Sequence, residues 1–174
     1  MKLTDRGKQA ADPPAARRVR LLVMDCDGVL TDGKIYLGAS GEELKVFHVQ
    51  DGQGISLWHS NGYHSAIITG RGAEPILRLR TAELQIGHLV TRSRDKLADL
   101  MEIIGGIGLG LDEVAYVGDD IGDIAVLDAV GIPIAVSNCV PDLLDHALYV
   151  TECPGGNGAI REVVEFLLRS HRAP

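Results

Sequence analysis

The sequence has few aromatic residues, few cysteines and no long apolar run. No basic stripe interleaved with aromatic residues is present, and the net charge is −7, which argues against a nucleic-acid-binding protein. No apolar run approaches membrane-spanning length, and the first eighteen residues lack the apolar centre of a signal peptide. We therefore expect neither nucleic acid nor a membrane among the partners.

The three cysteines, Cys26, Cys139 and Cys153, are widely spaced and form no CxxC pair. An odd number with this spacing indicates neither a disulfide framework nor a zinc site, so a reducing cytoplasm is the simplest setting. Because the protein is acidic, handling an anion requires local positive groups or a metal ion that offset its own field.

The composition, 45% hydrophobic and 24% charged, is typical of one globular domain at this length. Residues 1–18 carry basic residues beside Pro13-Pro14 and are predicted to be a disordered basic leader, followed by a single domain over residues 19–174. Two short strand-like runs about a Gly/Ser turn predict a β-hairpin over about 34–49. An isolated hairpin is marginal in water, so this one needs another surface, such as a second subunit.

Candidate buried strands alternate with helical patterns along the domain. The first, residues 19–24, is continuously apolar, as expected of a strand covered on both faces of a parallel sheet. The others are 64–69, 88–90, 114–117, 132–136 and 148–150. Helical patterns lead up to Asn61-Gly62, span 95–104 before Gly105-Gly106, and include 160–168. This alternation predicts an α/β fold with a doubly wound parallel sheet and no second domain.

Two acidic residues, Asp25 and Asp27, directly follow the first strand. They share a face of an extended chain, and Gly28 allows a sharp turn that gathers both near one point. An Asp-x-Asp-Gly segment is often only a polar turn. However, the carboxyl ends of strands in open α/β sheets are where ligands bind, so both interpretations stay open on this segment alone.

The other strand ends also carry polar residues. Thr69-Gly70-Arg71 follows the second strand, and Lys96 lies at the start of the helix after the third. Alone, each signal is weak, because Thr-Gly is a common strand exit and a solvated lysine is the commoner case. The fourth strand leads into Asp119, Asp120 and Asp123. Three carboxylates so close together repel one another, which indicates a cation or a nearby lysine.

Taken together, these strand ends predict phosphoryl chemistry. The residues gathered at one edge are Asp25, Asp27, Thr69, Lys96, Asp119, Asp120 and Asp123. Oxygen ligands without His or Cys suit Mg²⁺. A carboxylate beside this ion, a hydroxyl and an ammonium is arranged to attack phosphorus, and the second acid of the first pair can protonate the leaving oxygen.

The order of these motifs resembles the haloacid-dehalogenase-like phosphohydrolases over nearly the whole chain after the leader. The segments that carry this resemblance are Asp25-Cys26-Asp27-Gly28, Thr69-Gly70, Lys96 and Gly118-Asp119-Asp120. Further segments resemble a branch of that family that hydrolyses 3-deoxy-D-manno-octulosonate 8-phosphate (KDO 8-phosphate), an ester of a 2-keto sugar acid. They are residues 27–33, 41–45, 51–55, 69–71 and 155–162.

The resemblance implies an aspartyl-phosphate mechanism. Asp25 is expected to be the nucleophile, and Asp27 the general acid that later activates water. Thr69 and Lys96 are expected to hold the phosphoryl group. Mg²⁺ is expected on Asp25, the backbone carbonyl of Asp27, and Asp119, with Asp120 and Asp123 orienting Lys96 or metal-bound water.

Substrate contacts implied by the resemblance fall on Asp27, His48, Val49, Gln50, Asp51, Gly52, Arg71, Arg80 and Lys96. Arg71 carries the most weight, because a bidentate guanidinium fits the carboxylate of a 2-keto sugar acid. Three positions depart from the family pattern: Gln50 and Ser56 replace arginines, and Arg92 replaces a glycine. These departures leave open a sialic-type 9-phosphate, of N-acylneuraminate or KDN, as the substrate.

The resemblance also implies a homotetramer without a separate cap domain. The hairpins are expected to join around a four-fold axis, and a neighbouring subunit to complete each active site. A mobile glycine-rich segment, Gly155-Gly156-Asn157-Gly158, is expected to reach a neighbouring site.

Two other functions remain as alternatives. A phosphoryl-accepting receiver module also places acids, Thr and Lys at strand ends, but here the crowded acids come after Lys96, which a receiver does not need. A non-catalytic assembly domain, like those attached to nucleotide-sugar synthetases, is the other. Against it, this chain retains every catalytic position.

Overall fold

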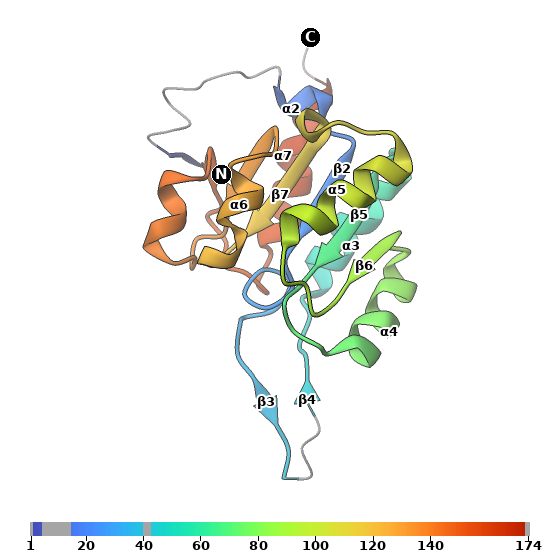
Figure 1. Cartoon of the computed structure of the whole chain (residues 1–174), viewed down its shortest axis with the longest axis vertical. Helices are drawn as coiled ribbons and strands as arrows, with labels where there is room; N and C mark the ends of the chain where they lie inside the picture. The colour runs from blue at the N-terminus through green and yellow to red at the C-terminus, as the bar shows by residue number, and fades with distance from the viewer. Residues whose placement is uncertain (1, 5–14, 40–42, 173–174) are drawn as a thin grey trace.

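The computed structural model describes residues 2–4, 15–39 and 43–172, and it is built around a seven-stranded sheet (Figure 1). The strands are β1 (Lys2–Leu3), β2 (Leu21–Met24), β5 (His64–Ile68), β6 (His88–Val90), β7 (Val114–Gly118), β8 (Ile132–Ala135) and β9 (Tyr149–Val150). Their order across the sheet is β1-β9-β8-β7-β2-β5-β6, and every neighbouring pair is parallel except β1 with β9. The predicted doubly wound parallel sheet is confirmed.

Helices cover both faces of this sheet. They are α2 (Ala15–Arg18), α3 (Val49–Ser60), α4 (Glu74–Leu84), α5 (Lys96–Ile107), α6 (Ile124–Leu127) and α7 (Ala159–Arg172), with 3₁₀ turns η1 (Leu111–Glu113), η2 (Ile121–Asp123) and η3 (Pro141–Asp145). One hydrophobic cluster includes Trp58 of α3 and Leu167 of α7, and the other includes Leu100 of α5 and Leu127 of α6. No helix in the described ranges is long and apolar enough to span a bilayer.

The burial of β2 on both faces explains why its sequence shows no alternation of apolar and polar residues. Leu21, Leu22, Val23 and Met24 are all fully buried. Leu22 and Met24 join the cluster beneath α3 and α7, whereas Leu21 and Val23 join the cluster beneath α5 and α6. Each buried side chain of this size contributes about 1.5–3 kcal/mol of transfer free energy. An apolar residue is therefore favoured at every position of the strand.

The sheet changes direction beside β2. From β2 the chain builds outward through β5 and β6 on one side, and then β7, β8 and β9 fill the other side. The register places Met24 beside Ile67 of β5 and Val117 of β7, so the residues that follow these three strands meet at one edge. In open α/β sheets this reversal leaves a crevice at the carboxyl ends of the strands. The crevice here lies between β2 and β7.

A small hairpin extends from this edge, away from the body of the molecule (Figure 1). Its strands, β3 (Tyr36–Leu37) and β4 (Glu43–Leu44), are antiparallel and pair Tyr36 with Leu44. They lie within the range of 34–49 predicted for a hairpin, and the turn at 40–42 lies outside the described residues. The predicted range overlaps α3 by one residue, because α3 begins at Val49.

The prediction of a disordered leader over residues 1–18 is wrong at both of its described ends. Lys2–Leu3 pair with Tyr149–Val150 at the edge of the sheet, and the Thr4 amide donates to the Leu148 carbonyl at 3.0 Å. Ala15 and Ala16 of α2 are buried in the cluster that contains α7. The basic residues of this segment indicated disorder, although Ala15 and Ala16 are small apolar residues that suit close packing. Residues 5–14 lie outside the described residues.

The helix α5 begins and ends at different kinds of signal. The Asp95 carboxylate accepts a hydrogen bond from the Ala98 amide at 3.0 Å and caps the helix, as Asp does at this position. The predicted end at Gly105-Gly106 is wrong, because the helix continues to Ile107 and closes at Gly108 with φ +71°. Both Gly105 and Gly106 are exposed within the helix, where they cost stability without breaking it.

Candidate active site

The loop after β2 is a tight turn held by backbone hydrogen bonds. The Asp25 amide donates to the Val117 carbonyl at 3.0 Å, which ties the loop to β7. The Cys26 carbonyl accepts from the amides of the residues at 29–31. The buried Thr31 hydroxyl accepts from the Gly28 amide at 3.4 Å and the Gly33 amide at 3.3 Å. These bonds fix where the two acids of this loop point.

Gly28 is required at the point where this loop meets the one after β7. Its φ is +99°, a conformation that other residues rarely adopt. A Cβ atom at this position would lie 2.0 Å from Oδ2 of Asp119, which is far inside contact distance. The missing side chain therefore lets the Asp119 carboxylate lie directly against the loop that carries Asp25.

Three carboxylates meet in the crevice. One oxygen each from Asp25, Asp119 and Asp123 lies within 4.8 Å of the others. Burial raises the pKa of Asp25 to about 6, and the neighbouring Asp123 adds to this effect while Lys96 opposes it. Burial, followed by the charge of Asp25, raises the pKa of Asp119 to about 8. Oδ1 of Asp119 is buried and accepts no hydrogen bond.

Lys96 compensates part of this negative charge. Its Nζ lies 2.9 Å from Oδ1 of Asp25 and 2.7 Å from Oδ1 of Asp123. Burial alone would lower the pKa of Lys96, but the two carboxylates outweigh it, so the pKa is raised above 10.5. The lysine at the start of α5 is therefore a buried cation of the crevice and not a solvated surface residue.

Asp123 has all its acceptor positions engaged. The Tyr116 hydroxyl donates to Oδ1 at 2.5 Å, beside the bond from Lys96. The amides of Asp119 and Asp120 donate to Oδ2 at 3.0 and 3.3 Å. Burial and the negative charge of Asp123 raise the pKa of Tyr116, so its hydroxyl stays a donor. Asp123 thus positions Lys96 and the backbone that carries Asp119.

The loops after β5 and β6 form the opposite wall. Thr69 is buried; its amide donates to Val90, and its carbonyl accepts from the Ser93 amide at 3.0 Å. Its Oγ1 accepts from the Arg71 amide at 3.3 Å. The two loops are therefore joined to each other, and the Thr69 hydroxyl is fixed at the floor between them.

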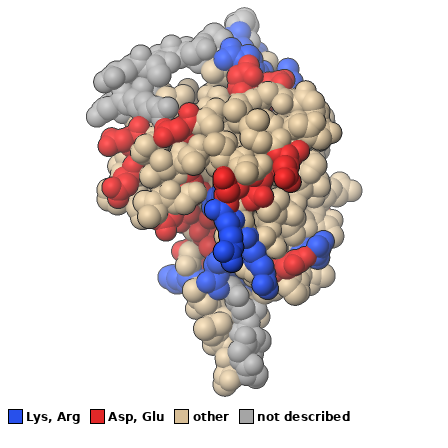
Figure 2. Space-filling view, in the orientation of Figure 1, with Lys and Arg blue, Asp and Glu red and all other residues tan. Residues whose placement is uncertain are grey.

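A cavity of about 310 Å³ joins these walls. It is lined by Asp25, Asp27, Thr69, Gly70, Arg71, Ser93, Arg94, Lys96, Asp119, Asp120, Gly122 and Asp123. Every acid, hydroxyl and lysine that the sequence analysis placed at the sheet edge lies here, together with Arg71. Ser93 and Arg94 were not predicted. Figure 2 shows basic and acidic side chains next to each other on this face of the molecule, above the hairpin.

Asp27 has a partner that the sequence analysis missed. Lys45 of the hairpin forms an ion pair with Oδ1 of Asp27, and the Lys45 side chain is only 3% exposed. Nε of Arg71 lies 3.8 Å from Oδ2 of the same carboxylate. Leu44 and Val46 on either side of Lys45 are exposed, so this arm of the hairpin turns its charge inward and its apolar residues outward. A lysine between two apolar residues in a strand-like run was the sequence signal that could have indicated this contact.

The remaining predicted substrate contacts do not line the cavity. Val49 and Gln50 are exposed at the start of α3, whereas Gly52 is buried there. Asp51 is buried and accepts from the amides of Gly158 at 3.2 Å and Arg161 at 2.8 Å. Burial raises its pKa despite these two bonds. Within this chain, the Asp51 carboxylate serves to cap α7.

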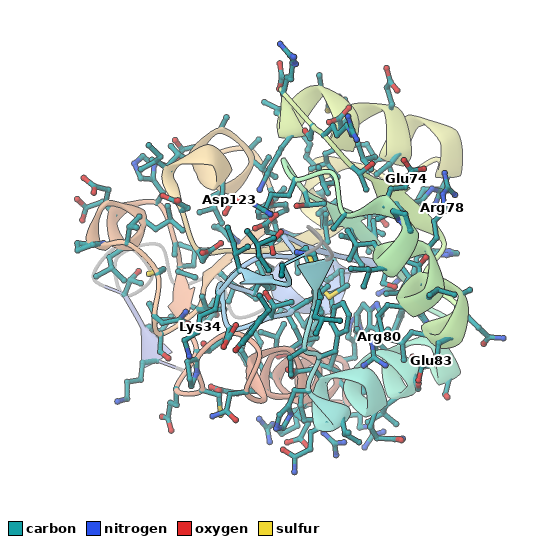
Figure 3. The ribbon with its side chains drawn as sticks, turned by 90° about the horizontal axis from the view of Figure 1, so that it is seen from below. Lys34, Glu74, Arg78, Arg80, Glu83 and Asp123 are labelled. Atoms are coloured by element: carbon teal, nitrogen blue, oxygen red, sulfur yellow. The ribbon has the colours of Figure 1, made fainter. Side chains whose placement is uncertain are left out.

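His48 and Arg80 also lie outside the cavity lining. The guanidinium of Arg80 lies 5.1 Å from the centre of the Phe47 ring and forms an ion pair with Glu83 at 2.8 Å. Figure 3 shows Arg80 and Glu83 on the side of α4, apart from Asp123 in the centre of the view. Arg80 packs against α3 in this chain, where a Cβ on Gly52 would touch its guanidinium.

The glycine-rich segment before α7 packs on its own chain. The Gly156 amide donates to the Val29 carbonyl at 2.9 Å, and the Gly155 amide to Oδ1 of Asn138 at 2.7 Å. A Cβ on Gly155 would lie 1.7 Å from the Gly28 carbonyl oxygen. The prediction that this segment is mobile and reaches a neighbouring site stays a prediction. Its glycines allow a close packing that buttresses the loop after β2.

Comparison with known proteins extends these observations. The family of haloacid dehalogenase-like hydrolases matches residues 75–163. The chain is 44% identical to the 3-deoxy-D-manno-octulosonate 8-phosphate phosphatase KdsC of Escherichia coli K12 over 163 residues, which cover 93% of this chain and 86% of that protein.

Two crystal structures are similar over most of the chain. The phosphatase of the same substrate from Yersinia pestis has a TM-score of 0.89 and 43% identity, covering 91% of this chain and 85% of that one. The enzyme from Moraxella catarrhalis, solved in complex with a magnesium ion, a phosphate ion and KDO, has a TM-score of 0.87 and 38% identity. That match covers 91% of this chain and 90% of the other.

Proposed function

The chain belongs to the haloacid dehalogenase-like hydrolases, and we propose that it is a Mg²⁺-dependent phosphatase that converts 3-deoxy-D-manno-octulosonate 8-phosphate to KDO and phosphate. The observation that carries the reaction class is the meeting of Asp25, Asp119 and Lys96 in one crevice at the reversal point of the sheet. The relatives named above support the substrate, because the match spans most of both chains.

The crevice fits a magnesium ion. The buried Oδ1 of Asp119 accepts no hydrogen bond, and burial raises the pKa values of Asp25 and Asp119, so a bound cation would offset the cost of ionising both carboxylates in the crevice. Asp25, Asp119 and the backbone carbonyl of Asp27 would hold the ion, whereas Asp123 is already engaged by Lys96 and Tyr116. When bound, Mg²⁺ offsets the carboxylate charges and stabilises the negative charge of the transferring phosphoryl group.

In the first half of the reaction, the Asp25 carboxylate attacks phosphorus and forms an aspartyl phosphate. The P–O bond to the sugar breaks, and the protonated Asp27 carboxyl gives its proton to the leaving sugar oxygen. The Lys96 ammonium and the Thr69 hydroxyl both line the cavity and hold the phosphoryl oxygens. The bond from Lys96 also favours the ionised form of Asp25, which is the nucleophilic form.

In the second half, the Asp27 carboxylate accepts a proton from a water molecule. The resulting hydroxide attacks the phosphorus of the aspartyl phosphate, the acyl-phosphate P–O bond breaks, and Asp25 and inorganic phosphate are released. Lys45 and Arg71 stand on either side of Asp27 and orient its carboxylate for both proton transfers. Asp27 ends this step protonated and ready for the next ester.

The substrate carboxylate is assigned to Arg71 at the cavity wall. His48, Val49, Gln50 and Arg80 lie away from this chain's cavity, and in our proposal they act at the boundary with a neighbouring subunit. Asp51 and Gly52 are buried and support the packing of α3 against α7 and α4.

We further propose a homotetramer assembled through the hairpins. Leu37 and Leu44 of the hairpin are 69% and 65% exposed, an apolar surface on a projecting element. A second copy of this surface supplies the cover that a two-stranded hairpin needs. None of the three cysteines in the described residues forms a disulfide, and we place the enzyme in the cytoplasm.

The test is Mg²⁺-dependent phosphate release from KDO 8-phosphate, a sialic-type 9-phosphate and an aryl phosphate, each with and without chelator. A clear preference in kcat/KM for the octulosonate ester, lost with chelator and in Asp25→Asn, is the expected result. Activity on the other two esters alone contradicts the substrate and keeps the phosphatase. Mg²⁺-independent release contradicts the proposed role of the metal ion. No release from any ester contradicts the reaction itself and leaves the assembly-domain alternative.

A further inference from the structure

The loop between β6 and α5 carries two arginines that the proposed chemistry does not use. We propose that Arg92 and Arg94 form, with Arg71, an anion subsite at the mouth of the cavity, which selects phosphate esters that carry a carboxylate besides the scissile phosphate. The proposal deepens the proposed function and rests on it, because it names what distinguishes the substrates of the same site.

Arg92 is held in a backbone conformation that its side chain does not favour. Its φ is +58°, in the left-handed region. The Arg92 amide donates to the Arg71 carbonyl at 3.1 Å, and the next amide, of Ser93, donates to Thr69 at 3.0 Å. The two loops are therefore joined at the position where a glycine would fit with less strain. An outlier that the surroundings impose beside a catalytic cavity points to a functional side chain.

The Arg92 side chain turns back along the same wall. A Cβ on Gly72 would lie 2.8 Å from Nε and 3.1 Å from Cζ of Arg92, so the guanidinium lies against the bare backbone of Gly72. Gly72 directly follows Arg71, whose side chain lines the cavity together with that of Arg94. The joined loops thus bring Arg92 close to the two arginines that line the cavity, and Figure 2 shows basic side chains gathered on this face.

Two of these guanidinium groups, those of Arg92 and Arg94, differ from that of Arg71, which forms an ion pair with Asp27. Arg78 pairs with Glu74 at 2.5 Å, and Arg161 pairs with Glu165 at 2.7 Å. Within residues 2–4, 15–39 and 43–172, no carboxylate lies within 4 Å of Arg92 or Arg94 to form an ion pair. In a chain of net charge −7, Arg92 and Arg94, which have no carboxylate partner within 4 Å, add positive charge beside Arg71, whose own partner is Asp27. A bound anion relieves their mutual repulsion.

The position of the three guanidinium groups determines which part of a ligand they bind. Thr69, Lys96 and the carboxylates occupy the inner part of the cavity, where the phosphoryl group reacts, so the entrance receives the far end of the ester. Guanidinium groups match the planar, two-oxygen geometry of a carboxylate better than the geometry of a sugar hydroxyl. A neutral sugar phosphate has no carboxylate for these arginines to bind, so it is held only in the inner part of the cavity.

The experiment measures selectivity in the full-length protein with Mg²⁺. We compare kcat/KM for KDO 8-phosphate with kcat/KM for glucose 6-phosphate, in wild type, Arg92→Gly, Arg94→Ser and the control Arg78→Ser. The control removes one surface arginine that is paired with Glu74 on the outer side of α4 (Figure 3). We expect the ratio of the two values to fall about tenfold in each test variant, mainly through a higher KM for the acid, since a charge-assisted bond contributes about this factor.

Folding and general charge effects are separated by two further results. Arg92→Gly relieves the left-handed strain, so its melting temperature should equal or exceed that of wild type while its selectivity falls. Arg78→Ser should keep the ratio within about twofold. An unchanged ratio in both test variants, or an equal fall in Arg78→Ser, overturns the subsite. Wild-type hydrolysis of an aryl phosphate reports the proposed function separately, because that ester has no carboxylate.

Discussion

The crevice between β2 and β7 and the hairpin of β3 and β4 expose opposite kinds of surface. In the crevice, Asp25, Asp119 and Asp123 are buried or half-buried, and Lys96 with the proposed cation offsets their charge. In the hairpin, Leu37 and Leu44 are exposed, whereas the single lysine of its second arm is buried. The crevice gathers its residues within one chain, whereas the hairpin leaves apolar side chains exposed, which we propose a second chain to cover.

The two regions are joined at one contact, between Asp27 of the crevice and Lys45 of the hairpin. In the proposed mechanism, Asp27 is the acid, and this ion pair orients it from an element that we propose to be covered by a second subunit. Under these two proposals, the ion pair links the chemistry to oligomerisation. A change in one region should therefore have an effect in the other.

The largest effect is expected within the crevice. Asp25→Asn removes the nucleophile and should reduce phosphate release to background. Asp27→Asn should lower kcat by about 10²- to 10⁴-fold, because it removes general acid and base catalysis from both half-reactions. Steady-state kinetics with KDO 8-phosphate and with an aryl phosphate measure both. Near-wild-type rates in both variants contradict the two-carboxylate mechanism.

The contact between the regions should have the next largest effect. Lys45→Met leaves Asp27 without its hairpin partner, so we expect kcat to fall by about tenfold, as for loss of one charge-assisted bond. Lys34→Met is the matched control, because Lys34 lies on the same hairpin and pairs with Asp32 at 3.2 Å with its side chain 74% exposed. An equal loss in both variants would show a general effect of hairpin charge instead.

The hairpin itself is tested through assembly. The double variant Leu37→Glu with Leu44→Glu should dissociate the proposed tetramer, since burying these charges in an apolar interface is unfavourable. Sedimentation velocity measures the oligomer, and circular dichroism checks the fold. Leu79→Glu, at a 75% exposed position of α4, is the control. A double variant that keeps the wild-type sedimentation coefficient would place the interface elsewhere.

The smallest effect is expected on the stability of the metal-free protein. The pKa values of Asp25, about 6, and of Asp119, about 8, both exceed the ordinary 3.8, so the folded state prefers the protonated forms. Their contribution to stability is complete below pH 4 and is lost as pH rises through 6 and 8. Between these limits the melting temperature should fall by about 2–4 °C for each kcal/mol lost.

Asp119→Asn tests this dependence directly. The amide removes one of the repelling charges, so the metal-free variant should melt at a higher temperature than wild type at pH 8 and at an equal one at pH 4. Added Mg²⁺ should stabilise wild type more as pH rises and should leave the variant nearly unchanged. A metal-free wild type that grows more stable from pH 4 to pH 8 contradicts the sign of these shifts.

Much of the fold could be predicted from the sequence, because the apolar runs are short and clearly bounded. The continuous apolar run that contains β2 and the regular apolar spacing of α7 each matched one type of element. Helix α4 was not predicted; it buries only Leu77, Thr81 and Leu84 of eleven residues, so its apolar pattern is weak. The end of α5 was misplaced because glycines in a helix and after a helix look alike in sequence.

Some residues of the candidate site could likewise be predicted from the sequence, and others could not. The residues at strand ends could be placed together, because parallel strands bring their carboxyl ends to one edge. Lys45 could not, because its ion pair depends on the direction in which the hairpin leaves the domain. The role of Asp51 was also hidden: its position before an apolar run gave no sign that it caps α7, more than a hundred residues later.

The most direct test of the central claim is to trap phosphate on the protein. Asp27→Asn is mixed with Mg²⁺ and a ³²P-labelled aryl phosphate whose leaving group needs no proton, and the reaction is quenched in acid. One portion is counted for protein-bound ³²P, and a second is reduced with borohydride, which releases the phosphate, and analysed by peptide mass spectrometry. The account predicts Mg²⁺-dependent labelling, with residue 25 converted to homoserine and no labelling when Asp25→Asn is added to the variant. Phosphate release without labelled protein, or labelling at another residue, would contradict it.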